Sequence, residues 1–373
     1  NKGNYITADC YADHFSSSYC FFKDNKTYNG KAGEEQVRKR TRNHNLSIKG
    51  IFKLGNRHKL SVGTEYIVDV LKSQTDNIAK EDAYTLALFA QDEIKLLRNL
   101  QALIGVRYIY HENFKNHATP NVALMYKPGK FNFRASYAAG FRTPTLSELY
   151  ATDIAKKNDR LTIGNLDLKP EKNNYFSLSA EYVHERFSVS VNAFYNNIRD
   201  MIDYNTIATG DKAMEQYGHK EVRQRDNITE AKVHGINVSA NAYLGAGFNL
   251  SGGYTHLNTQ DVELEQPIDK SIKNAYNINA QWAHSWKIYR LNINLNGRIN
   301  SKRFSKSYGY APEYQLWDLN TRHSFNLKSV IIEPGCGMEN LFDYMDDRPY
   351  NSNYATLTPG RSFYISLSLK FKS

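Results

Sequence analysis

The chain has 373 residues, of which 41% are hydrophobic and 13% aromatic, and its formal net charge is +10. No run approaches the roughly 20 consecutive apolar residues that a membrane-spanning helix needs, which excludes a helical membrane protein but not membrane-spanning strands. Lysine and arginine are scattered along the chain, and the one tight cluster is Arg38-Lys39-Arg40. This distribution favours attraction to anionic lipid head groups over a nucleic-acid partner.

The three cysteines are Cys10, Cys20 and Cys336. They form no CxxC pair and no HExxH motif is present, so the sequence predicts no metal site. Cys10 and Cys20 flank a polar, Ser-rich stretch, and we expect a disulfide between them, as in exposed proteins of an oxidising compartment. Two unrelated thiols are the alternative.

Alternating strands recur from the start of the chain to its end. Residues 4–12 read as the last part of a strand, and residues 41–54 form the first complete one. Apolar and polar residues also alternate clearly in 188–193, 276–282, 291–296 and 362–371. A period of two predicts sheet with one apolar and one polar face, although the strands of a soluble sandwich alternate in the same way.

Strand length and loop length separate a barrel from a sandwich. Many strands extend for about ten residues or more, as tilted membrane spans require. Short turns alternate with long polar loops, which we expect near residues 13–40, 74–82, 111–120, 143–169, 204–226, 257–271, 303–313 and 343–360. Such alternation is typical of an up-and-down barrel whose two rims face different compartments. We therefore predict an all-β fold, a transmembrane antiparallel up-and-down β-barrel with about 15–16 strands, and one helical turn at 211–217.

Three motifs carry a family resemblance. Residues 141–150 read Phe-Arg-Thr-Pro-Thr-Leu-Ser-Glu-Leu-Tyr, and residues 164–171 read Gly-Asn-Leu-Asp-Leu-Lys-Pro-Glu. Residues 339–344 read Glu-Asn-Leu-Phe-Asp-Tyr and precede the closing strand. The first two resemble the twin boxes that flank one long extracellular loop in TonB-dependent outer-membrane receptors, and the third resembles the family's NLFD segment. The resemblance implies a protein of the bacterial outer membrane.

Members of that family are plugged barrels of 22 strands. Counted backwards from Phe371, the twin boxes flank the link between the strands that would be 13 and 14, where the family carries them. The resemblance therefore implies that residues 1–373 are the C-terminal portion of one barrel domain, with the plug domain and the first strands absent. The sequence begins at Asn1 and shows no signal peptide. We expect the natural protein to have several hundred further N-terminal residues.

The closest resemblance is to haem and cobalamin receptors of Bacteroidetes-type bacteria. It implies active import of a scarce metal chelate, most simply cobalamin or haem, driven by the TonB-ExbB-ExbD complex. Such a ligand would be cargo, and no resident cofactor is expected. The further partners implied are outer-membrane lipid, lipopolysaccharide, the missing plug and a surface lipoprotein. A ferric-siderophore receptor and a non-transporting binding barrel are the alternatives; an enzyme is not expected, because no G-x-S-x-G or similar nucleophile motif occurs.

Candidate site residues fall into two groups. Residues expected to contact ligand are aromatic or basic side chains of the long loops: Tyr150, Tyr217, His219, Arg223 and Arg225. Tyr150 has two interpretations, an axial haem ligand or an aromatic residue at the membrane interface. Residues expected to anchor the loop between the two boxes are Phe141, Arg142, Pro144, Glu148, Asn165, Leu168, Pro170 and Glu171. Within this group, Arg142 is expected to pair with Glu148 or Glu171.

Overall fold

The computed structural model describes residues 3–26, 29–155, 159–306, 309–346 and 358–372. In this part of the chain sixteen strands have ten residues or more, which agrees with the predicted number. They are β1 (Tyr5–Cys20), β2 (Glu35–Leu54), β3 (His58–Ser73), β4 (Ile78–Leu97), β5 (Leu100–His111), β6 (Lys115–Tyr126), β7 (Phe131–Arg142), β10 (Glu171–Val183), β11 (Phe187–Thr209), β12 (Glu221–Gly245), β13 (Phe248–Asp261), β14 (Asn274–Trp286), β15 (Tyr289–Asn300), β18 (Tyr314–Asn326), β19 (Val330–Glu339) and β20 (Ser362–Phe371).

The remaining elements are short and lie in the connections. They are α1 (Leu146–Tyr150), β8 (Thr152–Ala155), β9 (Arg160–Ile163), α2 (Gly210–Tyr217), β16 (Arg303–Ser305) and β17 (Gly309–Ala311). Helix α2 lies where the sequence predicted one helical turn. Among the described residues, neither helix has the length or the apolar character to cross a membrane.

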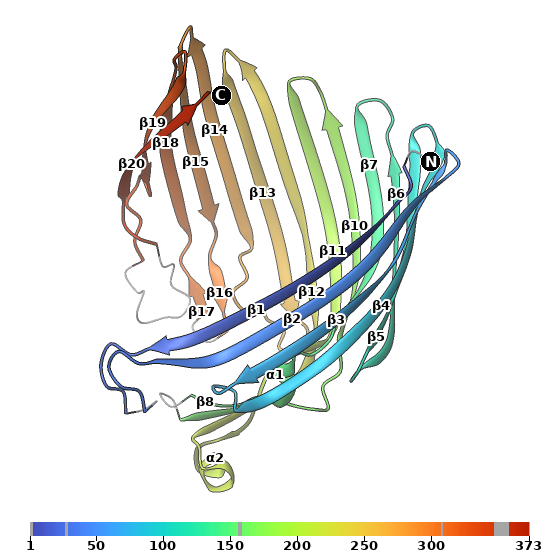
Figure 1. The fold of residues 1–373 in the computed structure, drawn as a ribbon, viewed down its shortest axis with the longest axis vertical. Helices are drawn as coiled ribbons and strands as arrows, with labels where there is room; N and C mark the ends of the chain where they lie inside the picture. Colours follow the sequence, from blue (N-terminus) through green and yellow to red (C-terminus); the bar gives the residue numbers. More distant parts are fainter. Residues whose placement is uncertain (1–2, 27–28, 156–158, 307–308, 347–357, 373) are drawn as a thin grey trace. The chain divides into compact units, whose positions relative to one another are not determined.

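The chain divides into two compact units. Unit 1 consists of Asn1–Leu124, Ser136–Tyr175 and Asn197–Glu230. In it, β1 to β5 pair in chain order and every pair is antiparallel. Figure 1 shows these strands side by side, as a meander with tight turns requires.

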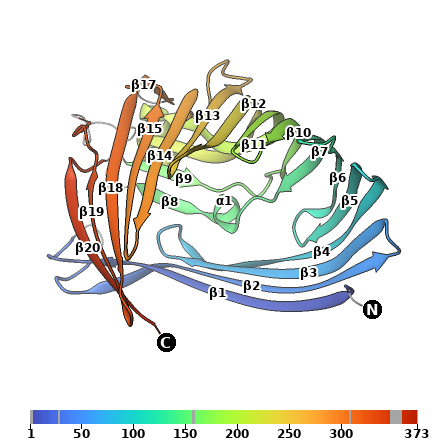
Figure 2. The ribbon, with the colours of Figure 1, turned by 90° about the horizontal axis from the view of Figure 1, so that it is seen from above.

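The two faces of this meander differ, because successive side chains point to opposite sides of a strand. On β2, Leu46 and Ile48 are exposed on one face, whereas Asn45 and Ser47 lie on the other. The second face carries helix α1, whose Leu146 is buried in a cluster with Leu71, Ile78 and Ala83. Figure 2 also shows α1 close to β4. An exposed apolar face opposite a polar face that holds a loop helix is the pattern of a membrane barrel wall.

Unit 2 consists of Met125–Ala135, Phe176–Asn196 and Ala231–Ser373. Strands β13, β14, β15, β18, β19 and β20 pair antiparallel, each with the next (Figure 2). Asn279 donates to Asn294 and Asn296 at 2.6 Å on one face. Tyr276 and Ile278 are exposed on the opposite face. The predicted alternation of apolar and polar faces is confirmed here as well.

Several connections predicted as long loops are instead extensions of paired strands. Residues 74–82 reduce to a four-residue turn, since β3 reaches Ser73 and β4 begins at Ile78. Residues 111–120 reduce to the turn between His111 and Lys115. Polar residues such as Lys80 and Asp82 continue the ladder beyond the apolar band, and polarity alone made them read as loop. Most of the predicted loop 343–360 lies outside the described residues.

The predicted disulfide between Cys10 and Cys20 is wrong in this structure. Both residues belong to the same continuous strand, β1, and both thiols are free. Ten residues of extended strand place the two Cα atoms about 33 Å apart, whereas a disulfide needs about 4.4–6.8 Å. The Ser-rich stretch between them pairs with β2 instead of forming a turn.

Candidate functional site

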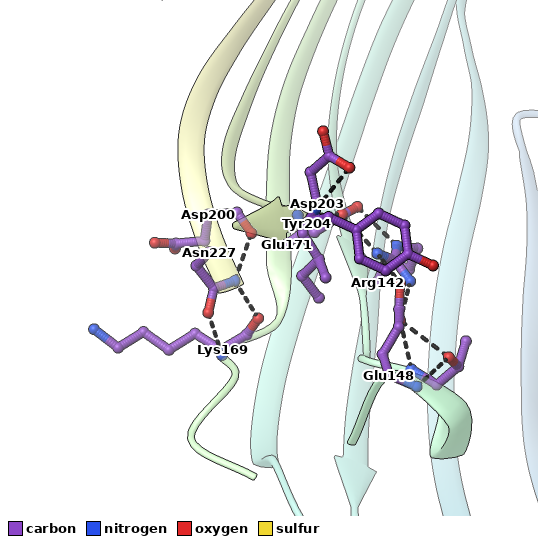
Figure 3. Close-up of polar contacts among 10 residues, drawn as sticks. Arg142, Glu148, Lys169, Glu171, Asp200, Asp203, Tyr204 and Asn227 are labelled. Carbon is purple, nitrogen blue, oxygen red and sulfur yellow. Dashed lines mark hydrogen bonds and ion pairs between the residues drawn. The ribbon is translucent and has the colours of Figure 1, made fainter. Parts of the chain in front are cut away.

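Arg142, at the end of β7, joins the two sequence boxes through ion pairs. Its Nη1 lies 2.9 Å from Glu148 Oε2 in α1, and its Nη2 lies 2.6 Å from Glu171 Oε1 at the start of β10. Its Nε donates to Glu171 Oε2 at 2.7 Å, so the contact with Glu171 is bidentate (Figure 3). Planar guanidinium suits this double recognition, which fixes geometry as well as charge. We call Arg142, Glu148 and Glu171 the box clasp.

Helix α1 is positioned by a capping box at its first turn. The Thr145 hydroxyl accepts the Glu148 backbone N–H at 3.2 Å, and the Thr145 N–H donates to Glu148 Oε2 at 2.8 Å. This reciprocal arrangement satisfies two amides that a helix start leaves unpaired. Glu148 therefore has two tasks, because one carboxylate closes the helix cap and binds Arg142.

The electrostatics of the clasp favour the ionised carboxylate. Burial of Glu148 raises its pKa, but hydrogen bonds from Arg142 and Thr145 outweigh burial and leave the pKa below its ordinary value. The net stabilisation is therefore present above the ordinary carboxyl pKa and is lost as the pH falls through the lowered one.

The second box closes onto the end of α1 through backbone contacts. The N–H of Gly164 donates to Ala151 O at 2.7 Å, and the N–H of Asn165 donates to Glu148 O at 3.0 Å. A Cβ on Gly164 would lie 2.4 Å from Leu149 O, so this approach requires glycine. Leu168 is then buried against Leu149 and Ile202. The side chain of Asn165 accepts from the Asp167 N–H and shapes the turn between these contacts.

Three further anchor candidates flank these contacts. Pro144 and Pro170 are buried next to the two ends of the loop, where a residue without an N–H ends strand pairing. Phe141 stacks on His117, with ring centroids 4.0 Å apart and planes at 26°. The structure thus brings all eight anchor candidates to one end of β7 and β10.

Asn227, which the sequence gave no reason to select, joins β10, β11 and β12. Its amide donates to Lys169 O at 2.9 Å and to Asp200 O at 2.7 Å, and its side-chain oxygen accepts the Lys169 N–H at 2.7 Å (Figure 3). Asp200 has a positive φ of 56°. The N–H of Ile202, two residues later, donates to Glu171 Oε1 at 2.9 Å, which links this region to the clasp.

A second link holds the middle of the loop to β12. Strand β9 pairs parallel with the start of β12, where Arg160 lies opposite Glu221. Beside this pairing, His219 Nδ1 lies 2.9 Å from Asp159 Oδ1, and this hydrogen bond lowers the pKa of Asp159. His219 therefore contributes to a contact between two loops, and its role as a ligand residue stays a prediction.

The ligand candidates do not converge in one place. Tyr150, the last residue of α1, packs against both buried clusters of the loop. Tyr217 is half-buried at the end of α2. Arg225 lies over the ring of Tyr204, 3.6 Å from its centroid, and donates to its hydroxyl at 2.6 Å. Arg223, on the same face of β12, pairs with Glu221. We call Tyr204, Arg223 and Arg225 the loop cation cluster.

No group of three or more His, Cys, Asp or Glu side chains in the described ranges could hold a metal ion. Asp76, in the turn after β3, was missed by sequence reasoning. Its carboxylate accepts from Ser147 of α1 at 3.0 Å and from Lys39 at 3.4 Å, and its carbonyl accepts the Thr152 N–H. Its selection would have required knowing that α1 folds back onto this turn.

Comparison with known proteins identifies the family of this chain. The family described as TonB dependent receptor-like, β-barrel, matches residues 3–341. The chain therefore belongs to this family of bacterial outer-membrane β-barrels, and the predicted family, fold class and location are confirmed.

Solved structures support the same fold. A single-substitution variant of the ferric enterobactin receptor PfeA of Pseudomonas aeruginosa has a TM-score of 0.78 at 18% identity, and the match covers 98% of this chain and 59% of that one. The siderophore receptor PirA of Acinetobacter baumannii has a TM-score of 0.73 at 16% identity, and the match covers 99% of this chain and 63% of that one. The FrpB iron transporter of Neisseria meningitidis has a TM-score of 0.71 at 13% identity, and the match covers 98% of this chain and 59% of that one. The chain spans about three fifths of the length of these proteins.

Proposed function

We propose that this chain forms a large part of the wall of a TonB-dependent importer whose cargo is a ferric siderophore. The observation that carries the import function is the family match over residues 3–341. The names of the similar solved structures, which refer to siderophores or iron, favour the siderophore alternative over the haem or cobalamin that the sequence suggested. The assignment of residues 1–373 to the C-terminal part of one barrel, with a plug supplied by further chain, belongs to this proposal.

The chemistry of the loop residues supports a chelate that brings its own iron ligands. Haem import commonly uses a protein side chain on the iron. In the described part of the chain, His219 is held by Asp159 and Tyr150 packs into the loop interior. A ferric siderophore needs no protein ligand on its metal. The charge of an anionic siderophore is recognised by cations, and its apolar groups pack on aromatic side chains. The loop cation cluster offers both.

TonB is the energising partner in this proposal, and the box clasp has a structural role. The clasp holds α1 and β9 against neighbouring strands, so that the loop keeps one shape while ligand binds elsewhere on the rim. A preformed loop reduces the ordering cost of binding. The clasp residues are therefore anchors and do not themselves bind the siderophore.

The full-length receptor, expressed in a strain without its own siderophore receptors, tests this function. We expect ⁵⁵Fe uptake with an anionic catecholate siderophore, and its loss when TonB is deleted. The double variant Arg223→Gln/Arg225→Gln should weaken siderophore binding at least about tenfold, equivalent to ~1.4 kcal/mol, because two cations leave the binding surface.

The matched control is Lys127→Gln/Lys130→Gln, which removes two positive charges beside the short turn between β6 and β7. It should bind as the unmodified receptor does. Uptake of haem or cyanocobalamin in place of the ferric siderophore would overturn the choice of cargo. Uptake that continues without TonB would overturn the import mechanism.

A further inference from the structure

The face of unit 1 opposite α1 has an ordered polarity along its strands. Leu46 on β2 lies opposite Tyr66 on β3, and Tyr66 lies opposite Leu86 on β4. Two residues nearer the α1 end, the register brings His44, Val68 and Tyr84 into one row. A further two residues along, Arg42 lies opposite Val70. Because Leu71 and Ala83 are buried under α1 on the other face, all these side chains point away from the loop helix.

A tyrosine row marks the edge of the apolar band. Tyr66 and Tyr84 have ring centroids 6.0 Å apart, and Tyr84 and Tyr110 have centroids 6.1 Å apart. Exposed Leu46 lies level with Tyr66 on this face, and exposed Ile48 and Leu88 lie two residues farther from the α1 end. Aromatic rings in such a position are typical of the membrane–water interface of an outer-membrane barrel.

From the level of Tyr84 toward the α1 end, the same face becomes basic. Five basic side chains, together with Val70, surround a groove of about 270 Å³; they are Arg40, Arg42, His44, Lys72 and Lys80. We call these five residues the outer basic groove. Lys80 pairs with Asp82 at 3.0 Å. Among the residues that the structure describes, Arg40, Arg42 and Lys72 have no ion-pair partner.

The groove is unfavourable for the protein alone. Arg40 lies directly opposite Lys72 in the antiparallel ladder. Like charges in such a pair are destabilising, because their Cβ atoms are only about 5 Å apart. An anion between them removes this repulsion, and arginine is well suited to bind the oxygens of a phosphate. The position beyond an aromatic row and an apolar band is the depth of the lipid head groups.

We propose that the outer basic groove binds the phosphate of an anionic, phosphorylated lipid of the outer leaflet. The acyl chains would lie along the apolar band, which continues from Tyr66 away from the α1 end. The phosphate would lie between Arg40, Arg42 and Lys72. This site goes beyond the proposed import function, because it lies on the face opposite α1 and not on the face that holds the twin-box loop. It gives a specific place to the general attraction for head groups that the basic composition suggested.

The test uses the full-length receptor in detergent and radiolabelled diphosphoryl lipid A as the probe. We expect the variant Arg40→Gln/Arg42→Gln/Lys72→Gln to retain at least tenfold less lipid A than the unmodified receptor. The control Lys49→Gln/Lys53→Gln/Lys130→Gln removes the same charge, with Lys49 and Lys53 on the opposite face of β2, and should retain a normal amount. Circular dichroism verifies that each variant is folded. If the triple variant does not fold, the single variant Lys72→Gln replaces it in the test, and we expect a smaller loss of lipid A binding.

Two competitors distinguish the source of the phosphate. Dephosphorylated lipid A should not displace the probe, and millimolar inorganic phosphate should displace little of it, because neither combines phosphate with acyl chains. Equal retention of lipid A by the triple variant would overturn the proposal. Full displacement by inorganic phosphate would also overturn it and would show a small-anion site. Siderophore uptake should be normal in the triple variant, so failure of this proposal is separate from failure of the import function.

Discussion

Replacing Arg142 by methionine should release the segment from Thr143 to Pro170 from the end of the barrel while the long strands remain folded. The substitution leaves Glu148 and Glu171, both largely buried, without their cation. Loss of one partner of a fully buried pair costs roughly 3–5 kcal/mol. The Arg142 side chain is 42% exposed, so solvent screening reduces the expected local cost to about 2 kcal/mol.

Hydrogen exchange measured by mass spectrometry reports this release. A local cost of about 2 kcal/mol corresponds to exchange roughly 30-fold faster in peptides from the loop. Peptides from β2 and β3 should exchange as before. The control Arg290→Met removes an exposed arginine beside the short turn between β14 and β15 and should leave loop exchange unchanged. Unchanged loop exchange in Arg142→Met would show that the ion pairs do not hold the loop.

Acid should have the same local effect as the substitution. Because the pKa of Glu148 is lowered in the folded loop, protection should be constant from neutral pH down to the ordinary carboxyl value of 4.5 and decrease only below it. In Glu148→Gln this pH dependence should be reduced, because the side chain at this position no longer titrates.

Gly164→Ala is the second substitution with a large expected effect. The new Cβ would lie 2.4 Å from Leu149 O and 2.6 Å from Leu149 C, which are backbone atoms that cannot rotate away. Either α1 or the second box must move, which would break the hydrogen bonds from Gly164 to Ala151 and from Asn165 to Glu148. Loss of these bonds with a steric clash costs roughly 2–4 kcal/mol locally. The consequence is a loop that is cleaved by protease while the barrel resists.

Gly252→Ala is the matched control, because it makes the same chemical change in a strand. A Cβ on Gly252 would meet its nearest atom, Asn277 O, at 3.4 Å, an ordinary contact, and its φ is not positive. Limited proteolysis should therefore cleave Gly164→Ala at least tenfold faster than Gly252→Ala. Equal cleavage rates would mean that the two boxes do not meet as closely as the structure shows.

Alternation along the strands made most of the fold predictable. A period of two is a local property, so Phe363 and Ile365 mark a strand face without any tertiary information. Polar strand ends were harder to predict. Lys80 and Asp82 pair beyond the apolar band, and in the sequence they look the same as a loop. Cys10 and Cys20 were misread for this reason.

Some contacts of the twin-box loop could likewise be predicted from the sequence, and others could not. Arg142 could be matched with Glu148 and Glu171 because the three residues belong to two recognisable boxes. Asn227 and Asp76 could not be selected, since their partners are backbone groups, a serine and a lysine that only folding brings close. His219 could not be matched with a partner for a related reason. Its partner Asp159 lies 60 residues away, and no sequence pattern connects the two.

Alternate side chains of these strands face lipid on one side and the barrel interior on the other. Ser47 and Ile48, adjacent on β2, test this arrangement most directly. Each is replaced by cysteine in a receptor whose native cysteines are serines, labelled with bimane, and reconstituted with nitroxide-bearing phospholipid. Bimane at position 48 should be strongly quenched by the lipid and bimane at position 47 should not. Equal quenching at both positions, or the reverse pattern, would contradict the account.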